Sequence, residues 1–152
     1  MHRLLVTLAA VAAFLAVAFP ASARTDVQIT IRHQVQHCHA WAVGSGPYRA
    51  SQSLHVAAGT EIVVTNNDLM PHKLVQLAGP AVTFTNLTSG MGMMGLKGPF
   101  APGMMGRMHS GTEFTLVKPG TYHFTTKPGE DYIANVKTTG EDNVLKLTVV
   151  VS

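Results

Sequence analysis

The stretch Phe-Thr-Leu-Val-Lys-Pro-Gly-Thr-Tyr-His-Phe-Thr-Thr, residues 114–126, contains two short segments in which large apolar residues alternate with polar ones. Alternation with a period of two is typical of a β-strand that buries one face and exposes the other. Between the two segments stands Lys118-Pro119-Gly120, and adjacent proline and glycine mark a turn. The stretch therefore predicts two consecutive strands separated by a tight turn.

The same pattern recurs along most of the chain after residue 24, where short apolar or alternating segments end at glycine, proline or asparagine. No stretch there has the 3.6-residue period of an amphipathic helix. We expect eight strands, around residues 27–35, 54–56, 62–65, 74–77, 82–84, 114–116, 122–126 and 145–151. This pattern predicts an all-β fold, an antiparallel Greek-key sandwich or small barrel.

Residues 1–23 have the composition of a signal peptide. His2 and Arg3 precede an apolar run from Leu4 to Phe19, and Ala21-Ser22-Ala23 provides a small-x-small cleavage site. The apolar run is shorter than the roughly 20 residues that span a membrane as a helix. We therefore expect one exported domain, residues 24–152, that is periplasmic or secreted and has no stable membrane insertion after cleavage.

Composition excludes several classes of protein. The 152 residues are 46% hydrophobic and only 12% charged, which argues against disorder. A single cysteine rules out a disulfide within the chain and a Cys-rich zinc site. The basic residues are scattered, so we expect no nucleic-acid partner. Hydrolase and nucleotide-binding motifs are absent, and we do not expect an enzyme.

The chemistry-bearing residues are eight histidines, eight methionines and one cysteine. The most compact group is His37-Cys38-His39, which follows the first expected strand, with His33 shortly before it. Thiolate and imidazole together suit copper, zinc or nickel. Two other interpretations stay open: a buried, inert cysteine beside exposed histidines, and a redox-active thiol.

A second candidate ligand follows a polar turn. After the strand at 62–65 come Asn66-Asn67-Asp68-Leu69-Met70-Pro71, and His72 begins the next strand. Pro71 biases Met70 toward an extended backbone, so His72 is expected at a rigid position, which suits a preorganised ligand. An exposed turn histidine is the alternative interpretation.

Residues 89–111 break the regular spacing of the strands with seven glycines, six methionines and two prolines. A loop of this length in a compact domain is often functional. Thioether sulfur prefers Cu(I) to harder ions, whereas a flexible apolar loop can equally serve as a docking surface or lid. The candidate copper contacts in this methionine-rich loop are Met93, Met94, Met104, Met105 and His109.

Three segments together resemble a known family. Residues 61–72 have a strand, a polar turn and a histidine; residues 114–124 have a strand, a Pro-Gly turn and a Tyr-x-Phe strand; and residues 144–151 have a closing strand. In this order they resemble the cupredoxins. Over roughly residues 27–151, the resemblance implies a cupredoxin-like sandwich, copper as the cofactor, and His72 as the first copper histidine.

The chain departs from that family in the loop that carries most of its copper ligands. The resemblance implies cysteine at position 126, followed by histidine and often methionine, but here Thr126 is followed by Lys-Pro-Gly-Glu-Asp-Tyr. We therefore expect a relocated centre in which Cys38 joins His72 and either His39 or His37. A thioether from Met70 or from the methionine-rich loop would complete it.

Such a centre predicts electron transfer through copper, with a redox protein as partner. The methionine excess suggests an alternative, a periplasmic Cu(I) carrier or buffer that works with a copper-trafficking protein. A third possibility is a metal-free interaction module that keeps the sandwich. His55 and His123 each stand between two apolar residues, so we expect both to face away from the core.

Overall fold

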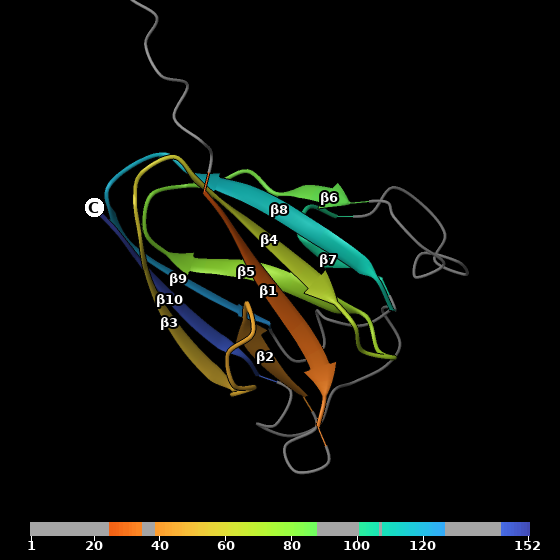
Figure 1. Ribbon diagram of the computed structural model, residues 1–152. Helices are drawn as coiled ribbons and strands as arrows, with labels where there is room; N and C mark the ends of the chain where they lie inside the picture. The colour runs from red at the N-terminus through yellow and green to blue at the C-terminus, as the bar shows by residue number, and fades with distance from the viewer. Residues whose placement is uncertain (1–24, 35–38, 88–100, 107, 127–143) are drawn as a thin grey trace, which may run out of the picture.

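The structure is a computed structural model, and it describes residues 25–34, 39–87, 101–106, 108–126 and 144–152 (Figure 1). All the regular elements in these residues are β-strands. The strands are β1 (Asp26–His33), β2 (His39–Val43), β3 (Ser51–Val56), β4 (Thr60–Asn66), β5 (His72–Ala78), β6 (Thr85–Leu87), β7 (Met104–Met105), β8 (Ser110–Leu116), β9 (Gly120–Thr126) and β10 (Lys146–Val151). The expected all-β fold is confirmed. The expected signal peptide lies outside the described residues, and none of the described segments is a helix able to span a membrane.

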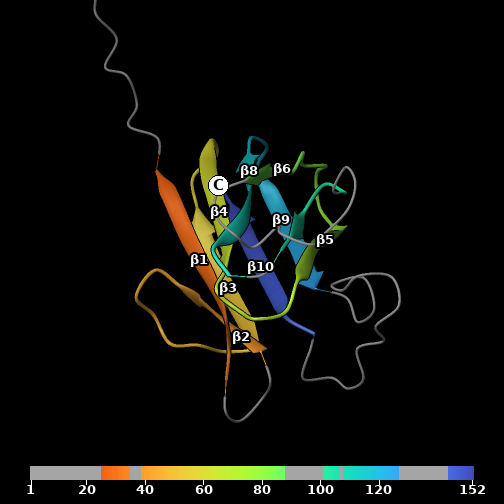
Figure 2. The same ribbon diagram turned by 90° about the vertical axis from the view of Figure 1, so that its right-hand side faces the viewer.

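The strands form two five-stranded sheets that pack face to face, as Figures 1 and 2 show from two directions. One sheet has the order β2-β1-β4-β8-β6, and the other has the order β3-β10-β9-β5-β7. The turn at Lys118-Pro119-Gly120 connects β8 to β9 and therefore carries the chain from one sheet to the other. Tyr122 stabilises this turn, because its hydroxyl donates a hydrogen bond of 2.6 Å to the Lys118 carbonyl.

Strand direction within the sheets is mixed, which differs from the antiparallel pairing that we expected. β1 runs parallel to β4, and β3 runs parallel to β10, whereas the other pairs are antiparallel. The alternation of apolar residues sets which face of a strand is buried, but it is the same for either direction. The sandwich could therefore be predicted from the sequence, and the parallel pairs could not.

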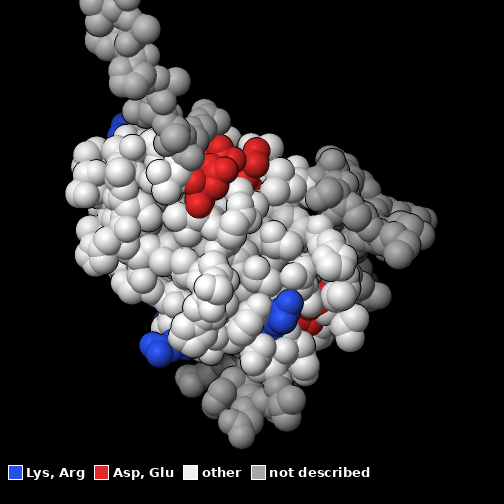
Figure 3. All heavy atoms as spheres, viewed as in Figure 1, with Lys and Arg blue, Asp and Glu red and all other residues white. Residues whose placement is uncertain are grey.

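The core lies between the sheets and consists of the apolar residues that alternate along the strands. In β4, for example, Ile62 and Val64 are fully buried, and in β9 Tyr122 and Phe124 are buried. His55 and His123 are exposed, as the alternation predicts. The outer surface is sparsely charged: few acidic or basic side chains lie on the face that Figure 3 shows, in keeping with the low charged fraction of the chain.

Three elements differ from the expected strands. β2 was not predicted, because its first four residues are all buried and the alternation that would identify a strand is lost. β7 has only two residues, too few for a periodic pattern. The short strand expected at 82–84 is wrong by a few residues, since the pairing in this region begins at Thr85 in β6.

One end of the sandwich gathers the residues of chemical interest. β1 and β2 are antiparallel neighbours in which His33 is paired with His39. β4 runs parallel to β1, with Asn66 beside Ile31. The turn that follows β4, and the start of β5, therefore lie at the same end as the two paired histidines.

Candidate metal centre

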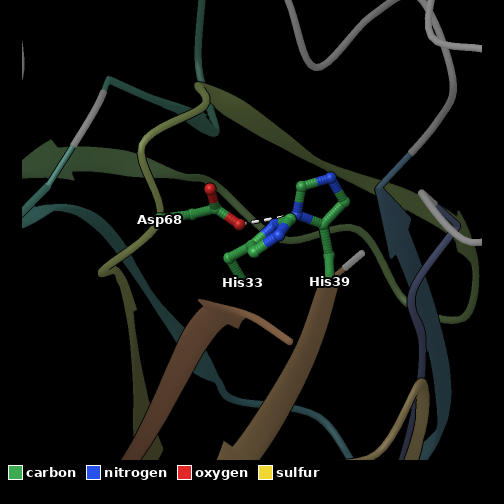
Figure 4. A group of neighbouring side chains, drawn as sticks. All are labelled: His33, His39 and Asp68. Carbon is green, nitrogen blue, oxygen red and sulfur yellow. Dashed lines mark hydrogen bonds and ion pairs between the residues drawn. The ribbon is translucent and has the colours of Figure 1, made fainter. Parts of the chain in front are cut away.

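Four side chains from different elements meet at this end of the sandwich. We call them the histidine–aspartate cluster: His33, His39, Asp68 and His72. The potential ligand atoms of its first three members lie within 4.8 Å of one another. Figure 4 shows these three side chains converging from β1, β2 and the turn after β4. The fourth member, His72, begins β5.

His33 and His39 are brought together by strand register. They are directly opposite each other in the β1–β2 pair, and their ring centroids are 5.7 Å apart. His33 is exposed, whereas His39 is 1% exposed. The pair thus reaches from the surface to the interior of the sandwich.

Asp68 is held in place by the turn that carries it. Its Oδ2 lies 2.5 Å from Nδ1 of His39, and its Oδ1 accepts a hydrogen bond of 3.0 Å from the Met70 amide. The amide of Asp68 donates to Oδ1 of Asn66 at 2.9 Å. This local hydrogen bonding is that of an Asx turn, and it fixes a carboxylate that is 1% exposed beside two buried imidazoles.

His72 is fully buried, and neither of its ring nitrogens has a hydrogen-bond partner among the residues that the structure describes. Its ring meets that of His39 edge to face, with centroids 4.8 Å apart. Its Nε2 lies 3.6 Å from Oδ2 of Asp68, beyond hydrogen-bond distance. A buried imidazole without a partner is costly to the fold, so His72 requires an explanation that the described protein groups do not supply.

The electrostatics of the cluster favour deprotonated ligands. Burial lowers the pKa of His72 by penalising its cationic form, although Asp68 opposes this effect. Burial would raise the pKa of Asp68, but its hydrogen bonds with His39 and with the Met70 amide, together with the nearby imidazole of His72, outweigh that effect and hold the pKa well below its usual range. The site therefore presents a carboxylate beside a neutral imidazole at neutral pH, the protonation states that metal binding requires.

The donor set fits a transition-metal ion. Imidazole nitrogen and carboxylate oxygen bind zinc and similar ions at about 2.0–2.2 Å, so two donors of one ion lie roughly 3–4 Å apart. The separation of 3.6 Å between Oδ2 of Asp68 and Nε2 of His72 falls in this range. The 2.5 Å between Oδ2 of Asp68 and Nδ1 of His39 is a hydrogen-bond distance, so His39 would offer its other ring nitrogen to an ion. An ion between Asp68 and His72 would give the unpartnered imidazole of His72 a ligand bond, and copper and zinc both suit such nitrogen and oxygen donors.

Two of the predicted ligands, His72 and His39, lie in this cluster. His37 and Cys38 fall in residues 35–38, outside the described residues, so the predicted meeting of Cys38 with His72 stays a prediction. Met70 lies in the turn beside Asp68 and is half-buried, and its amide donates a hydrogen bond to the carboxylate.

The methionine-rich loop is described only at its second end. Met93 and Met94 lie outside the described residues. Met104 and Met105 form β7 next to the start of β5, where Met105 is paired with His72 and is fully buried. His109 is exposed, and its amide donates a 2.7 Å hydrogen bond to the carbonyl of Asn66. This end of the loop therefore borders the cluster through its backbone.

Sequence reasoning missed Asp68 and His33 as members of the site. Asp68 stands in a run of polar residues that is typical of an ordinary turn, and its position four residues before His72 was the available signal. His33 was noted only as a neighbour of the His-Cys-His group. Its role depends on the β1–β2 register, which a sequence does not display.

Position 126, where the cupredoxin resemblance implies a cysteine ligand, has a structural role here. Oγ1 of Thr126 accepts a hydrogen bond of 3.2 Å from the Leu145 amide, and the Thr126 amide donates to the Leu145 carbonyl at 3.3 Å. The buried side chain of Thr126 thus connects β9 to the residue before β10.

Comparison with known proteins finds similarity in structure only. No protein-family model and no curated protein matches the chain. A variant of amicyanin in its reduced Cu(I) form at pH 4 is 21% identical, with a TM-score of 0.40, over 87% of this chain and 85% of that one. Amicyanin from Paracoccus versutus (Thiobacillus versutus) is 15% identical, with a TM-score of 0.38, over 89% and 86%. An inclusion body protein, PixA, from Burkholderia cenocepacia J2315 is 10% identical, with a TM-score of 0.48, over 88% and 99%. The functional assignment therefore depends on the geometry of the cluster itself.

Proposed function

We propose that the protein is an exported copper-binding protein in which the histidine–aspartate cluster holds the ion and serves electron transfer. The observation that carries this proposal is His72, whose two ring nitrogens are buried and lack hydrogen-bond partners among the described residues. A bound ion would use the lone pair that the fold leaves unpaired. The resemblance of residues 61–72 to the first copper segment of cupredoxins favours copper over other ions.

The placement of the ligands supports electron transfer. His33, His39 and His72 belong to paired strands, and Asp68 is fixed by three hydrogen bonds through its side chain and amide. Copper supplies exchange of one electron between Cu(II) and Cu(I). Side chains held in this way keep their positions when the charge of the ion changes, and a preorganised site of this kind avoids the cost of rearrangement.

The exposure of the cluster residues supports electron exchange with a partner protein. His39, Asp68 and His72 are each about 1% exposed or less, whereas His33 is exposed. Only one ligand edge therefore reaches the surface within the described residues. A redox protein that docks at the His33 end would approach the ion through this imidazole, and we propose no catalytic role.

A Cu(I) carrier or buffer is the second candidate. The six methionines between residues 89 and 111 offer soft thioether ligands, and β7 places Met105 opposite His72. In this alternative the methionine-rich loop would deliver Cu(I) to the cluster or receive it. Tight Cu(I) binding without reversible electron exchange would favour carriage.

Copper titration of the full chain tests the proposal. Trp41 is the single tryptophan, is fully buried, and lies two residues after His39 in β2. We expect one equivalent of Cu(II) to quench its fluorescence and to give a reversible redox wave. The His72→Ala variant should lose both signals, and the matched His55→Ala variant, changed at an exposed histidine in β3, should keep them.

If the unaltered chain, with all its histidines intact, retains no copper, the proposal is contradicted. The remaining interpretation would then be a metal-free interaction module. The contribution of Cys38 is tested separately with Cys38→Ser. If the unaltered chain shows an intense charge-transfer band and this variant does not, the Cys38 thiolate is one of the copper ligands. An unchanged spectrum would leave the histidines and Asp68 as the ligands.

A further inference from the structure

The geometry points to Asp68 as the residue that selects the oxidation state of the bound copper, so that the cluster binds Cu(II) more tightly than Cu(I). This inference rests on the proposed function and goes beyond it, because it names both the favoured ion and the side chain responsible. A site with this preference would differ from one built on thiolate and thioether sulfur, which selects Cu(I).

The position of the carboxylate is set by the fold. Asp68 accepts from the Met70 amide, donates its own amide to Asn66, and accepts through its carbonyl from the Met108 amide at 2.9 Å. Asn66, itself fully buried, also donates to the carbonyls of Met70 and Gly106. The carboxylate is therefore already directed into the cluster by a hydrogen-bonded turn, and binding of an ion need not rearrange it.

The charge of Asp68 acts at short range and away from water. Its Oδ2 lies 2.5 Å from His39 Nδ1 and 3.6 Å from His72 Nε2, within ion-pair distance of both buried imidazoles. Asp68 is the one carboxylate of the metal-ligand cluster found among the described residues. Attraction between two charges scales with their product and strengthens at low dielectric, so a buried carboxylate stabilises a doubly charged ion more than a singly charged one.

Ligand chemistry acts in the same direction. Carboxylate and imidazole suit Cu(II), whereas soft sulfur ligands select Cu(I). The contacts of Met70 and Met108 with Asp68 that fix the turn are made by backbone amides. Both the charge and the donor type of Asp68 thus oppose reduction of the ion, and removal of the charge should raise the reduction potential.

Replacement by the isosteric amide isolates this charge. Asp68→Asn keeps an oxygen that can accept from the Met70 amide but removes the negative charge. The matched control is Asp26→Asn. Asp26 is exposed at the opposite end of β1, seven residues before His33 and therefore about 23 Å away along the strand. Asp68→Ser, which also keeps a short acceptor, is the second variant if the first does not fold.

The measurements are the affinities of the full chain for Cu(II) and Cu(I), by competition with chelators, and the reduction potential. We expect Asp68→Asn to lower the ratio of Cu(II) to Cu(I) affinity at least tenfold, which raises the potential by about 59 mV for one electron. Asp26→Asn should change neither quantity. Cys38→Ser should leave the ratio in favour of Cu(II).

Three results would overturn the inference. Equal weakening of both oxidation states in Asp68→Asn and Asp68→Ser would show that the carboxylate only supports the fold. Preference for Cu(I) in the unaltered chain would contradict the inference while leaving copper binding intact. Failure of the unaltered chain to bind copper in either state would remove the proposed function as well, so the two failures are distinguishable.

Discussion

Asn66 and His72 lie at the two ends of one turn, are both fully buried, and differ completely in their hydrogen bonding. The side chain of Asn66 makes three hydrogen bonds, to the Met70 and Gly106 carbonyls and from the Asp68 amide. Neither ring nitrogen of His72 has such a partner in the described part of the chain. The fold can therefore satisfy a buried polar side chain at this end of the sandwich, and it does so for Asn66.

The contrast separates a structural role from a binding role. Burying a polar group without a partner costs free energy, so such groups are rare in proteins. Satisfied groups such as Asn66 contribute to stability, whereas an unpartnered buried group such as His72 lowers stability unless a ligand uses its ring nitrogens. Replacement by leucine should therefore mainly weaken copper binding at position 72 and mainly lower stability at position 66.

The largest expected effect is on copper affinity. Structural zinc sites in zinc-finger peptides bind their ion with about 10–16 kcal/mol. By this measure one of four ligands is worth about 2.5–4 kcal/mol, or roughly 100- to 1,000-fold in affinity. We expect His72→Leu to lose this amount, measured by competition with a chelator. Its unfolding free energy without metal should stay within about 1 kcal/mol of the unaltered chain, because an apolar group replaces an unpaired polar one.

Asn66→Leu is the matched variant, and its largest effect should be on stability. It removes two buried hydrogen bonds and one partly buried hydrogen bond, and it leaves two carbonyls and one amide without their partner. At about 1 kcal/mol each, we expect a loss of about 3 kcal/mol in denaturant unfolding of the metal-free protein. If His72→Leu were the more destabilising of the two, the contrast between the residues would be wrong.

A smaller effect is expected at Thr126, which occupies the position of the cysteine in the cupredoxin resemblance. Thr126→Val keeps the shape of the side chain but removes the oxygen that accepts from the Leu145 amide. We expect a loss of about 1 to 2 kcal/mol in stability and no change in copper affinity. If this variant folds but binds copper more weakly, residues in or after position 126 would contribute to copper binding.

The smallest effect concerns pH. Burial lowers the pKa of His72 in the folded protein, whereas the unfolded chain titrates near 6.5. Between these two values the unfolded state binds more protons, so stability falls as the pH falls. We expect the metal-free protein to lose stability through His72 as the pH falls below about 6.5.

Thermal unfolding across this range measures the pH effect, with His72→Leu as the reference that lacks it. The pKa of Asp68 is lowered in the folded state, so its contribution is present above the unfolded value near 3.9 and is lost only at lower pH. Identical pH profiles for the two proteins would contradict a buried, neutral His72.

Much of the fold was predictable, because burial of one face leaves alternation in the sequence. β4, β8, β9 and β10 follow this pattern and were predicted within a few residues of their bounds. β2 was missed because burial on both faces removes the alternation. Pairing direction left no trace in the sequence, so the two parallel pairs appeared only in the structure.

The candidate site was predictable in part, for a related physical reason. His72 was identified by its position after a polar turn, and His39 by its place in a compact group of ligand types. Asp68 was not identified because carboxylates are common in turns, where they form hydrogen bonds with the nearby backbone. Its contact with His39 joins residues that are 29 positions apart in the sequence. Contacts of this kind depend on register between strands, which single-strand patterns do not encode.

Pulsed electron paramagnetic resonance of the Cu(II)-loaded full chain counts the imidazoles bound to the ion. We predict three coupled imidazoles and the loss of one in each of His33→Leu, His39→Leu and His72→Leu, with no change in His55→Leu. A spectrum that keeps its imidazole couplings when His72 is replaced would contradict the claim that the buried, unpartnered histidine is a copper ligand.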